Sequence, residues 1–254
     1  MLEISSLPEK QIRDVIEGKK HLWEAKAQVN KKRQQKDFEN ASKITLGKNI
    51  KLYCGDCLEL ANKYLKDDSI DCIITDPPYL TKQIDCFEKL GQIAQRVLKP
   101  SGFCCFYTGK LNLAEIINIA SQYLDYYWQI IIQHYGSCGT NFNPKTIHAK
   151  KVNTFYKPIL VFQKPPAKKC QKYFNDVING SGIQKDLHPW QQSESELVPI
   201  VEAFTQVGDE IFDPFLGSGT TAIVSKNLKR KFVGFDVDEN CLAATKRRLT
   251  EDLN

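Results

Sequence analysis

The sequence predicts an α/β fold: a doubly wound, mostly parallel sheet of seven strands, with helices on both faces. Short apolar runs rich in β-branched residues, such as Ile70–Thr75, alternate with segments of helical spacing, such as Ile84–Leu98. Two of the apolar runs end in an acid followed by proline, at Asp76 and at Asp213. Strand–helix units of this length imply parallel strands joined by helical crossovers. The chain of 254 residues is long enough for one large domain with a sizeable core.

From Ile44 onward, strand and helix patterns alternate to the end of the chain. We expect strands over residues 49–54, 70–75, 103–107, 126–134, 159–163, 210–213 and 231–236. We expect helices over residues 58–66, 84–98, 111–123, 196–205, 220–228 and 239–250. The sequence Lys99-Pro100-Ser101-Gly102 is expected to end the helix before it, because proline and glycine are unfavourable inside helices.

Residues 1–42 are expected to form a helical extension, and residues 43–254 the main domain. The extension carries a narrow apolar stripe among lysines and glutamines, which favours a solvated helix packed on that domain. The stretch Ile12–Ala25 also resembles the tail of partition-protein (ParB-like) helix-turn-helix domains. This resemblance implies that the chain is the downstream part of a longer protein.

Composition favours a soluble protein of the cytoplasm. No apolar run approaches the ~18 residues of a membrane span, and the N-terminus lacks the basic and apolar regions of a signal peptide. Nine cysteines, several of them inside apolar runs, indicate reduced thiols rather than a disulfide framework. Cys54 and Cys57 have C-x-x-C spacing, but no second pair follows at zinc spacing, so we expect no metal site.

The first motif is Asp76-Pro77-Pro78-Tyr79. Because proline cannot continue a central ladder, the strand must stop at Asp76. The prolines then hold a carboxylate, two carbonyls and an aromatic ring at the carboxyl edge of the sheet, where open α/β sheets bind ligands. Such an acceptor cluster suits a planar molecule bearing an amino group. The alternative is a turn that only terminates the strand.

The second motif is Asp213-Pro214-Phe215-Leu216-Gly217-Ser218-Gly219-Thr220, followed by Asp236 at the end of the next strand. Glycines allow a tight turn and let a ligand approach bare backbone. An acid at the end of the second strand is well placed to accept hydrogen bonds from ribose hydroxyls. Because the third glycine of a dinucleotide fingerprint and the lysine of a P-loop are missing, we predict a different nucleoside cofactor.

Together the motifs resemble those of S-adenosylmethionine-dependent DNA amino-methyltransferases, with the catalytic motif first, as in the β group. The resemblance covers residues 50–249 and implies a Rossmann-like sheet with one antiparallel strand, near 159–163. It implies that Asp76 and the carbonyl of Pro77 accept hydrogen bonds from the target amine, and that Tyr79 stacks on the flipped base. It assigns cofactor contacts to Asp213, Pro214, Phe215, Gly217, Ser218, Gly219, Thr220 and Asp236.

Two further cofactor contacts are implied by shorter matches. Gly55-Asp56-Cys57 resembles the family's Gly-Asp-Cys, whose acid contacts the cofactor's adenine amine; a plain turn aspartate is the alternative. His188–Ser193 is similar to the His-x-Trp-Gly-Gln-Ser version of phage-type and partition-associated relatives, which implies a cofactor-carboxylate contact for Ser193. The alternative for Ser193 is a helix cap, because Ser193 and Glu196 form a capping box.

A basic segment lies between Tyr126 and Asn175, with eight lysines and neither Asp nor Glu. Aromatic residues are interleaved with the lysines, a pattern typical of contact with nucleic-acid phosphates. We expect this DNA-contact region to span about 134–187, and the protein to associate with the nucleoid. The predicted DNA-binding residues are Lys145, Lys150, Lys151, Lys168, Lys169 and Lys172. A solvated lysine surface is the alternative.

The resulting hypothesis is methylation of adenine N6 in DNA, because an Asp in the first motif position is more typical of adenine than of cytosine-N4 enzymes. The alternatives are cytosine N4, an RNA or protein-glutamine substrate, and a catalytically silent DNA-binding accessory. Only about 25 residues, 163–187, are available where relatives insert a target-recognition domain. We therefore expect either a short or degenerate target sequence, or target recognition by a second subunit in a homodimer or by an N-terminal DNA-binding domain.

Overall fold

The structure is a computed structural model that describes residues 48–78, 84–134, 150–180 and 194–251. The chain divides into two units, Met1–Thr45 and Leu46–Asn254. The predicted helical extension, residues 1–42, lies outside the described residues.

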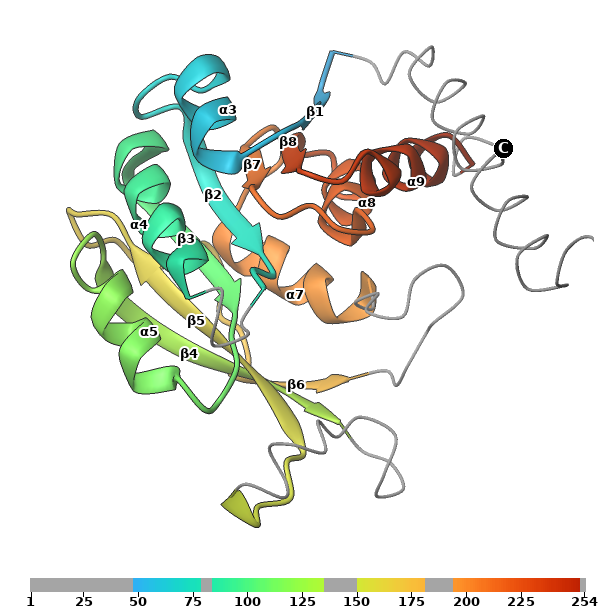
Figure 1. Cartoon of the computed structure of the whole chain (residues 1–254). Coiled ribbons are helices and arrows are strands. Elements are labelled where there is room, and N and C mark those ends of the chain that lie inside the picture. Colours follow the sequence, from blue (N-terminus) through green and yellow to red (C-terminus); the bar gives the residue numbers. More distant parts are fainter. Residues whose placement is uncertain (1–47, 79–83, 135–149, 181–193, 252–254) are drawn as a thin grey trace, which may run out of the picture. The chain divides into compact units, whose positions relative to one another are not determined.

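The described residues of this unit form a sheet of eight strands in the order β1-β8-β7-β2-β3-β5-β4-β6 (Figure 1). The first five strands in that order, from β1 to β3, run parallel to one another. β5 is antiparallel to both β3 and β4, and β6 is parallel to β4. The strands are β1 (Ile50–Cys54), β2 (Ile70–Thr75), β3 (Leu98–Tyr107), β4 (Asp125–His134), β5 (Tyr156–Gln163), β6 (Val177–Gly180), β7 (Glu210–Asp213) and β8 (Lys231–Asp236).

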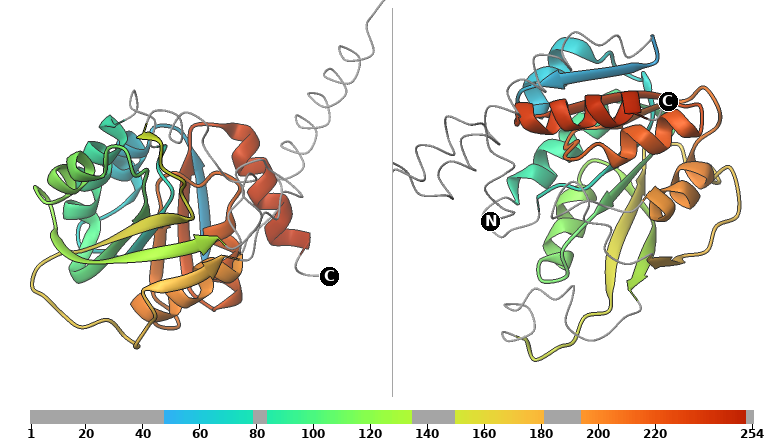
Figure 2. Two further views of the ribbon diagram at one scale, coloured as in Figure 1. Left: turned by 90° about the horizontal axis from the view of Figure 1, so that it is seen from below. Right: turned by 90° about the vertical axis from the view of Figure 1, so that its right-hand side faces the viewer.

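Helices cover both faces of this sheet (Figures 1 and 2). One face packs against α3 (Cys57–Tyr64), α4 (Asp85–Val97) and α5 (Leu113–Ala120). The other packs against α7 (Glu194–Phe204), α8 (Thr220–Asn227) and α9 (Glu239–Glu251). This is the doubly wound arrangement that the alternating sequence pattern predicts, so the predicted fold class is confirmed.

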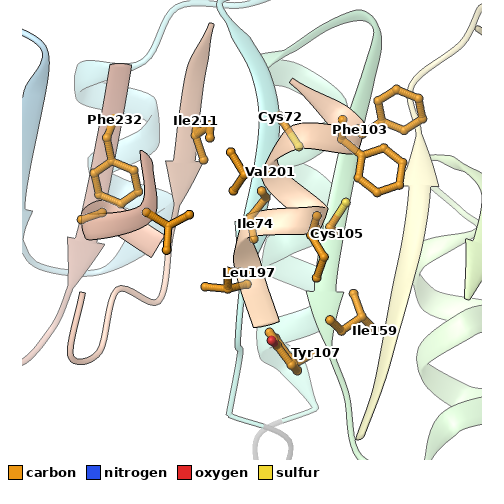
Figure 3. Close-up of a cluster of buried hydrophobic side chains, with 14 of the residues drawn as sticks. Cys72, Ile74, Phe103, Cys105, Tyr107, Ile159, Leu197, Val201, Ile211 and Phe232 are labelled. Atoms are coloured by element: carbon orange, nitrogen blue, oxygen red, sulfur yellow. The ribbon is translucent and has the colours of Figure 1, made fainter. Parts of the chain in front are cut away.

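The core consists of two apolar clusters, one on each face of the sheet. Successive residues of β2 alternate between them: Cys72 and Ile74 belong to the cluster under α7, and Ile73 to the cluster under α4. All three side chains are buried, which explains why the centre of β2, Cys72-Ile73-Ile74, is a continuous apolar run rather than alternating with polar residues. Figure 3 shows Leu197 and Val201 of α7 lying over the strand residues.

Two features of the sheet differ from the sequence prediction. The sheet has eight strands instead of seven, because Val177–Gly180 pairs with β4 as an edge strand. β3 also begins at Leu98, directly after α4, whereas the sequence predicts this strand only from Phe103. Buried Leu98 pairs with Ile70 of β2 before the register shifts, so the strand extends through residues 99–102, which are expected only to end the preceding helix.

The predicted antiparallel strand is confirmed as β5. Its reversal means that β5 starts at the carboxyl edge of the parallel strands and ends at their amino edge. Tyr107, the last residue of β3, pairs with Ile159 near the start of β5, whereas Phe103 pairs with Gln163 at its end. Within the described residues, none of the helices is both long enough and apolar enough to span a membrane.

Candidate active site

The two sequence motifs meet where β7 and β2 lie side by side. From this point the chain order runs outward in both directions, to β8 on one side and to β3 on the other. Such a switch point is where open α/β sheets bind ligands, outside the carboxyl ends of the strands. The hydroxyl of Thr75, the last residue of β2, donates a 2.6 Å hydrogen bond to Oδ1 of Asp213, the last residue of β7. The residue immediately before the first motif is therefore hydrogen-bonded to the first residue of the second motif.

Asp76, Pro77 and Pro78 follow β2 at this edge. Asp76 is half-buried and Pro77 is buried, so the backbone after the strand is held between its neighbours. The predicted stacking residue, Tyr79, lies outside the described residues. Asp76 thus follows directly on Thr75, whose hydroxyl contacts the second motif, and its role as an amine acceptor stays a prediction.

The glycine loop of the second motif connects β7 to α8. Gly217 and Gly219 have φ angles of +51° and +78°, which side-chain-bearing residues rarely adopt. Among the described residues, a Cβ atom on Gly217 would meet only the carbonyl of Phe215, at 3.9 Å, so the described part of the chain leaves space open beside this glycine. A Cβ atom on Gly219 would instead lie 2.3 Å from Oγ1 of Thr245. The first glycine leaves room for a ligand, and the second leaves room for α9.

Asp236 lies beside this loop, at the end of β8. Its Oδ2 accepts a 2.8 Å hydrogen bond from the amide of Gly217, and its Oδ1 accepts one of 2.9 Å from the amide of Asp238. Burial raises the pKa of this carboxyl above its ordinary value, although the hydrogen bonds from backbone amides oppose the rise. The carboxylate is half-exposed, and each of its oxygens retains a lone pair for ribose hydroxyls. Open space at Gly217 next to an oriented acceptor fits the adenosyl and methionine parts of S-adenosylmethionine.

Asp213 itself is buried, with 2% of its surface exposed. Besides the Thr75 hydroxyl, its Oδ1 accepts a 3.0 Å hydrogen bond from the amide of Phe215. Burial raises the pKa of this carboxyl to about 7, against the lowering effect of these hydrogen bonds. With these hydrogen bonds, Asp213 holds the turn between β7 and the glycine loop in place. Pro214 is buried and Phe215 half-buried in the same turn.

Asp56 follows β1 and caps α3, its Oδ1 accepting hydrogen bonds from the amides of Leu58 at 2.9 Å and Glu59 at 3.3 Å. Its Oδ2 pairs with Nζ of Lys89 on α4, at 2.8 Å. The hydrogen bond from Lys89 is the main cause that holds the pKa of Asp56 below its ordinary value. These contacts correspond to the turn-aspartate alternative, and contact with the adenine amine stays a prediction.

The remaining predicted cofactor residues surround the glycine loop. Thr220 is the first residue of α8 and is buried, and Ser218 is half-buried. Ser193 lies outside the described residues, immediately before α7. The next residue, Glu194, pairs with Nη2 of Arg248 at 2.8 Å, and Nη1 of Arg248 donates to the carbonyl of Ser218 at 2.6 Å. The first residue of α7 is thus connected to the glycine loop through Arg248.

Sequence reasoning missed three residues of this site: Thr75, Lys89 and Arg248. Thr75 could have been found, because a polar side chain at the end of an apolar strand is unusual and lies beside the motif. Lys89 and Arg248 carried no signal, since charged residues on amphipathic helices ordinarily face solvent.

The predicted DNA-binding lysines fall at two different edges of the sheet. Lys150 and Lys151 precede β5 and lie toward the carboxyl edge, on the side of Asp76, whereas Lys145 lies outside the described residues. Lys168, Lys169 and Lys172 follow the end of β5 and lie toward the amino edge, where the amide of Lys168 binds Gln163 and Lys172 pairs with Glu202 near the end of α7. The structure therefore does not bring the six lysines together.

A shallow pocket of about 310 Å³ lies away from both motifs, on β4 and β6. Trp128, Tyr126 and Val177 are among the residues that line it, and neither Asp76 nor the glycine loop contributes. The hydrogen bonds at the ends of β2, β7 and β8, rather than this pocket, hold the two motifs next to each other. Within the described part of the chain, no group of three or more His, Cys, Asp or Glu side chains could hold a metal ion.

The fold and the site define a Rossmann-like domain whose sheet has, at its carboxyl edge, the features of a nucleoside-binding site. The model of the DNA methylase family (N6/N4 methyltransferases) matches residues 70–181 and 169–247. Type II methyltransferase M.HpaI of Haemophilus parainfluenzae is 28% identical over 243 residues, covering 80% of this chain and 75% of that protein. M2.DpnII of Streptococcus pneumoniae is 28% identical over 237 residues, covering 73% and 84%.

Solved structures agree with these relatives. The M1.HpyAVI–SAM complex superposes with a TM-score of 0.64 and 27% identity, covering 79% of this chain and 98% of that one. The cytosine-N4-specific PvuII DNA methyltransferase gives a TM-score of 0.65 at 17% identity, over 80% and 90%, and shows the shared fold alone. The chain belongs to the N6/N4 DNA methylase family and is an S-adenosylmethionine-dependent DNA methyltransferase.

Proposed function

We propose that this protein methylates the N6 amine of adenine in DNA. The observation that carries the proposal is the hydrogen bond between Thr75 and Asp213, which holds the end of β2, immediately before Asp76, against the end of β7 that leads into the glycine loop. The preference for adenine over cytosine N4 rests on the resemblance, because Asp76 stands where cytosine-N4 enzymes more often carry serine.

In this proposal the chain contributes positioning and electrostatics. Asp76 and the carbonyl of Pro77 accept hydrogen bonds from the exocyclic amine, which favours a pyramidal nitrogen with its lone pair free. Tyr79 stacks on the base once it has left the duplex. Gly217, Ser218, Gly219 and Thr220 bind the methionine and ribose portions of the cofactor, with Asp236 at the ribose. S-adenosylmethionine, when bound, supplies the electrophilic methyl group.

Asp76→Ala tests the catalytic assignment. We expect methyl transfer to fall by about 10²–10³-fold or more, because an acceptor that acts in the transition state is removed. Cofactor affinity, measured by calorimetric titration, should stay within about twofold, since no assigned cofactor contact is lost. Asp125→Ala, which removes an exposed acid at the start of β4, is the control and should keep normal activity. Methylation at the normal rate by the Asp76 variant would refute the role.

The base is identified by digesting methylated DNA to nucleosides and separating them by mass. N6-methyladenine is the expected product, and N4-methylcytosine alone would exclude adenine as the target. Transfer of tritiated methyl groups to DNA, RNA and protein in parallel reactions tests the substrate class. Transfer to RNA or protein but not to DNA would overturn the proposal.

We also propose that residues 1–42, or a second copy of the chain, supply target recognition. The support is the short segment between β5 and α7, of which the described part forms only a loop and the four-residue strand β6. Removal of residues 1–42 should then reduce sequence discrimination while leaving methyl transfer to non-cognate DNA. If the variant without residues 1–42 is monomeric and still discriminates between DNA sequences as before, neither these residues nor a second copy of the chain supplies target recognition.

A further inference from the structure

Two arginines are buried among the described residues: Arg248, with 7% of its surface exposed, and Arg230, with 8%. A buried guanidinium is retained only where its donors are matched by acceptors, since an unpaired buried charge is costly. Both side chains bind the helices α7 and α8, but at opposite ends of them. Of the two, only Arg248 contacts the glycine loop, so Arg230 is a control for the general contribution of a buried arginine to stability.

Arg248 lies on α9 and binds the starts of both helices. Its Nη1 donates to the carbonyl of Ser218 at 2.6 Å and lies 3.4 Å from Oγ1 of Thr220, the first residue of α8. Its Nη2 pairs with Glu194, the first residue of α7, at 2.8 Å. One turn earlier on α9, Thr245 packs against Gly219. α9 therefore supports the glycine loop at Ser218 and Gly219, next to the open space at Gly217.

Arg230 binds the other ends of the same helices. Its Nη2 donates to the carbonyl of Thr205, which follows α7, at 2.8 Å, and its Nε donates to the hydroxyl of Thr205 at 3.0 Å. Its Nη1 donates to the carbonyl of Leu228, which ends α8, at 2.6 Å. These contacts lie before β8, at the amino edge of the sheet, away from both motifs. Arg230 thus has similar burial and similar partners without contact to the loop.

We infer that Arg248 is a positioning residue for cofactor binding. By holding the carbonyl of Ser218 against α9, it fixes the Gly217–Gly219 backbone with its open side toward the ligand. By pairing with Glu194, it also fixes the start of α7 relative to that loop. The ligand acted upon is the methionine end of S-adenosylmethionine, so the inference rests on the proposed assignment of the loop.

The test compares Arg248→Met with Arg230→Met in the full chain. The Kd for S-adenosylhomocysteine, measured by calorimetry, is expected to rise about tenfold in Arg248→Met, equivalent to about 1.4 kcal/mol. It should stay within twofold in Arg230→Met, although both variants lower the melting temperature. The KM for S-adenosylmethionine should rise with the Kd, while kcat at saturating cofactor changes less than twofold, because the base-binding motif is untouched.

Arg248→Lys keeps the charge but cannot bind Ser218 and Glu194 together with a planar fork, so we expect an intermediate, roughly threefold increase in Kd. This milder variant also decides the question if the methionine variant does not fold. A normal Kd in the Arg248 variants, or equal increases in the Arg248 and Arg230 variants, would overturn the inference.

Asp236→Ala distinguishes failure of the inference from failure of the assigned cofactor site. If Asp236→Ala weakens S-adenosylhomocysteine binding and Arg248→Met does not, the loop binds the cofactor and the role of Arg248 is wrong. If neither substitution weakens binding, the assignment of the glycine loop itself is wrong. If both weaken binding while Arg230→Met does not, both stand.

Discussion

Asp213 connects the chemistry of single residues to the arrangement of the site. Its carboxyl is buried, and its Oδ1 accepts from a side chain on β2 and from the backbone of its own turn. A carboxyl whose hydrogen bonds go to the protein itself holds the residues that donate them, here Thr75 and Phe215, in place. We therefore expect its ionisation to affect the stability of the fold.

A pH-dependent contribution to stability is the first consequence. Burial raises the pKa of Asp213 to about 7 in the folded protein, whereas the ordinary value is 3.8. Between about pH 4 and 7 the folded state therefore holds a proton that the unfolded state has lost. The free energy of unfolding should decrease as pH rises through this window, by up to about 1.4 kcal/mol per pH unit from this group. Asp213→Asn cannot ionise and should lose that slope in urea unfolding measured from pH 5 to 8.

Thr75→Val provides a matched change on the other side of the hydrogen bond. The Thr75 hydroxyl lowers the pKa of Asp213, so its removal should raise that pKa further and extend the descending slope above pH 7. It should also destabilise the fold by about 1–3 kcal/mol, because a buried acceptor loses a donor. Parallel slopes in the original protein and in Asp213→Asn would contradict the assigned ionisation.

Single-residue roles were the hardest part to predict from the sequence. An acid after a strand can contact a ligand or hold a turn, and the choice depends on partners that are distant in the chain. Thr75 lies 138 residues from Asp213, and Lys89 lies 33 residues from Asp56. The motif pattern identified which residues gather at the edge, but their burial and pairing are tertiary properties.

At the scale of elements, the start of α8 combines two glycines with different surroundings. Gly219 is in the left-handed region and is closed in by Thr245 of α9, whereas Gly217 is left-handed but open. The same substitution should therefore have different consequences at the two positions.

Gly219→Ala is expected to destabilise the protein by roughly 2–4 kcal/mol, because strain at positive φ adds to a clash with a β-branched side chain. Gly217→Ala should cost only about 1–2 kcal/mol, from strain alone. It should instead weaken cofactor binding, because its methyl group would occupy the open space beside Asp236. Urea unfolding and calorimetric titration of both variants measure the two effects. Equal losses of stability would show that Thr245 does not restrict Gly219.

The elements that carry strong periodicity were predicted correctly, and those that depend on pairing were not. Ile70–Thr75 and Lys231–Asp236 were found with their observed bounds, because the central residues of a parallel strand buried on both faces are mostly apolar. The strand β6 (Val177–Gly180) has four residues, no alternation and a glycine. It forms a strand because its backbone pairs with the second half of the longer strand β4. No local pattern could have predicted it.

At the scale of the whole methyltransferase domain, the direction of β5 separates lysines that are close in sequence. Lys150 and Lys151 come before this antiparallel strand, and Lys168 and Lys169 come after it. The basic segment suggests one DNA-binding surface, but the reversal of β5 distributes it over two opposite edges. Lys164, at the end of β5, pairs with Asp68 at 2.7 Å and so belongs to the amino edge.

DNA must approach the edge that carries Asp76 for a flipped base to reach it, so we predict unequal roles for the two lysine pairs. Lys150→Gln/Lys151→Gln should weaken DNA binding and reduce the dependence of log K on log salt by on the order of 2, since each phosphate contact contributes about 0.9. Lys168→Gln/Lys169→Gln removes the same charge from exposed side chains at the amino edge and should change both quantities little. Fluorescence anisotropy with a duplex at several salt concentrations measures the effect. Equal slopes for the two double variants would indicate that net charge, rather than the edge, determines DNA binding. A larger effect of the second pair would place the duplex on the amino edge, where it could not deliver a base to Asp76.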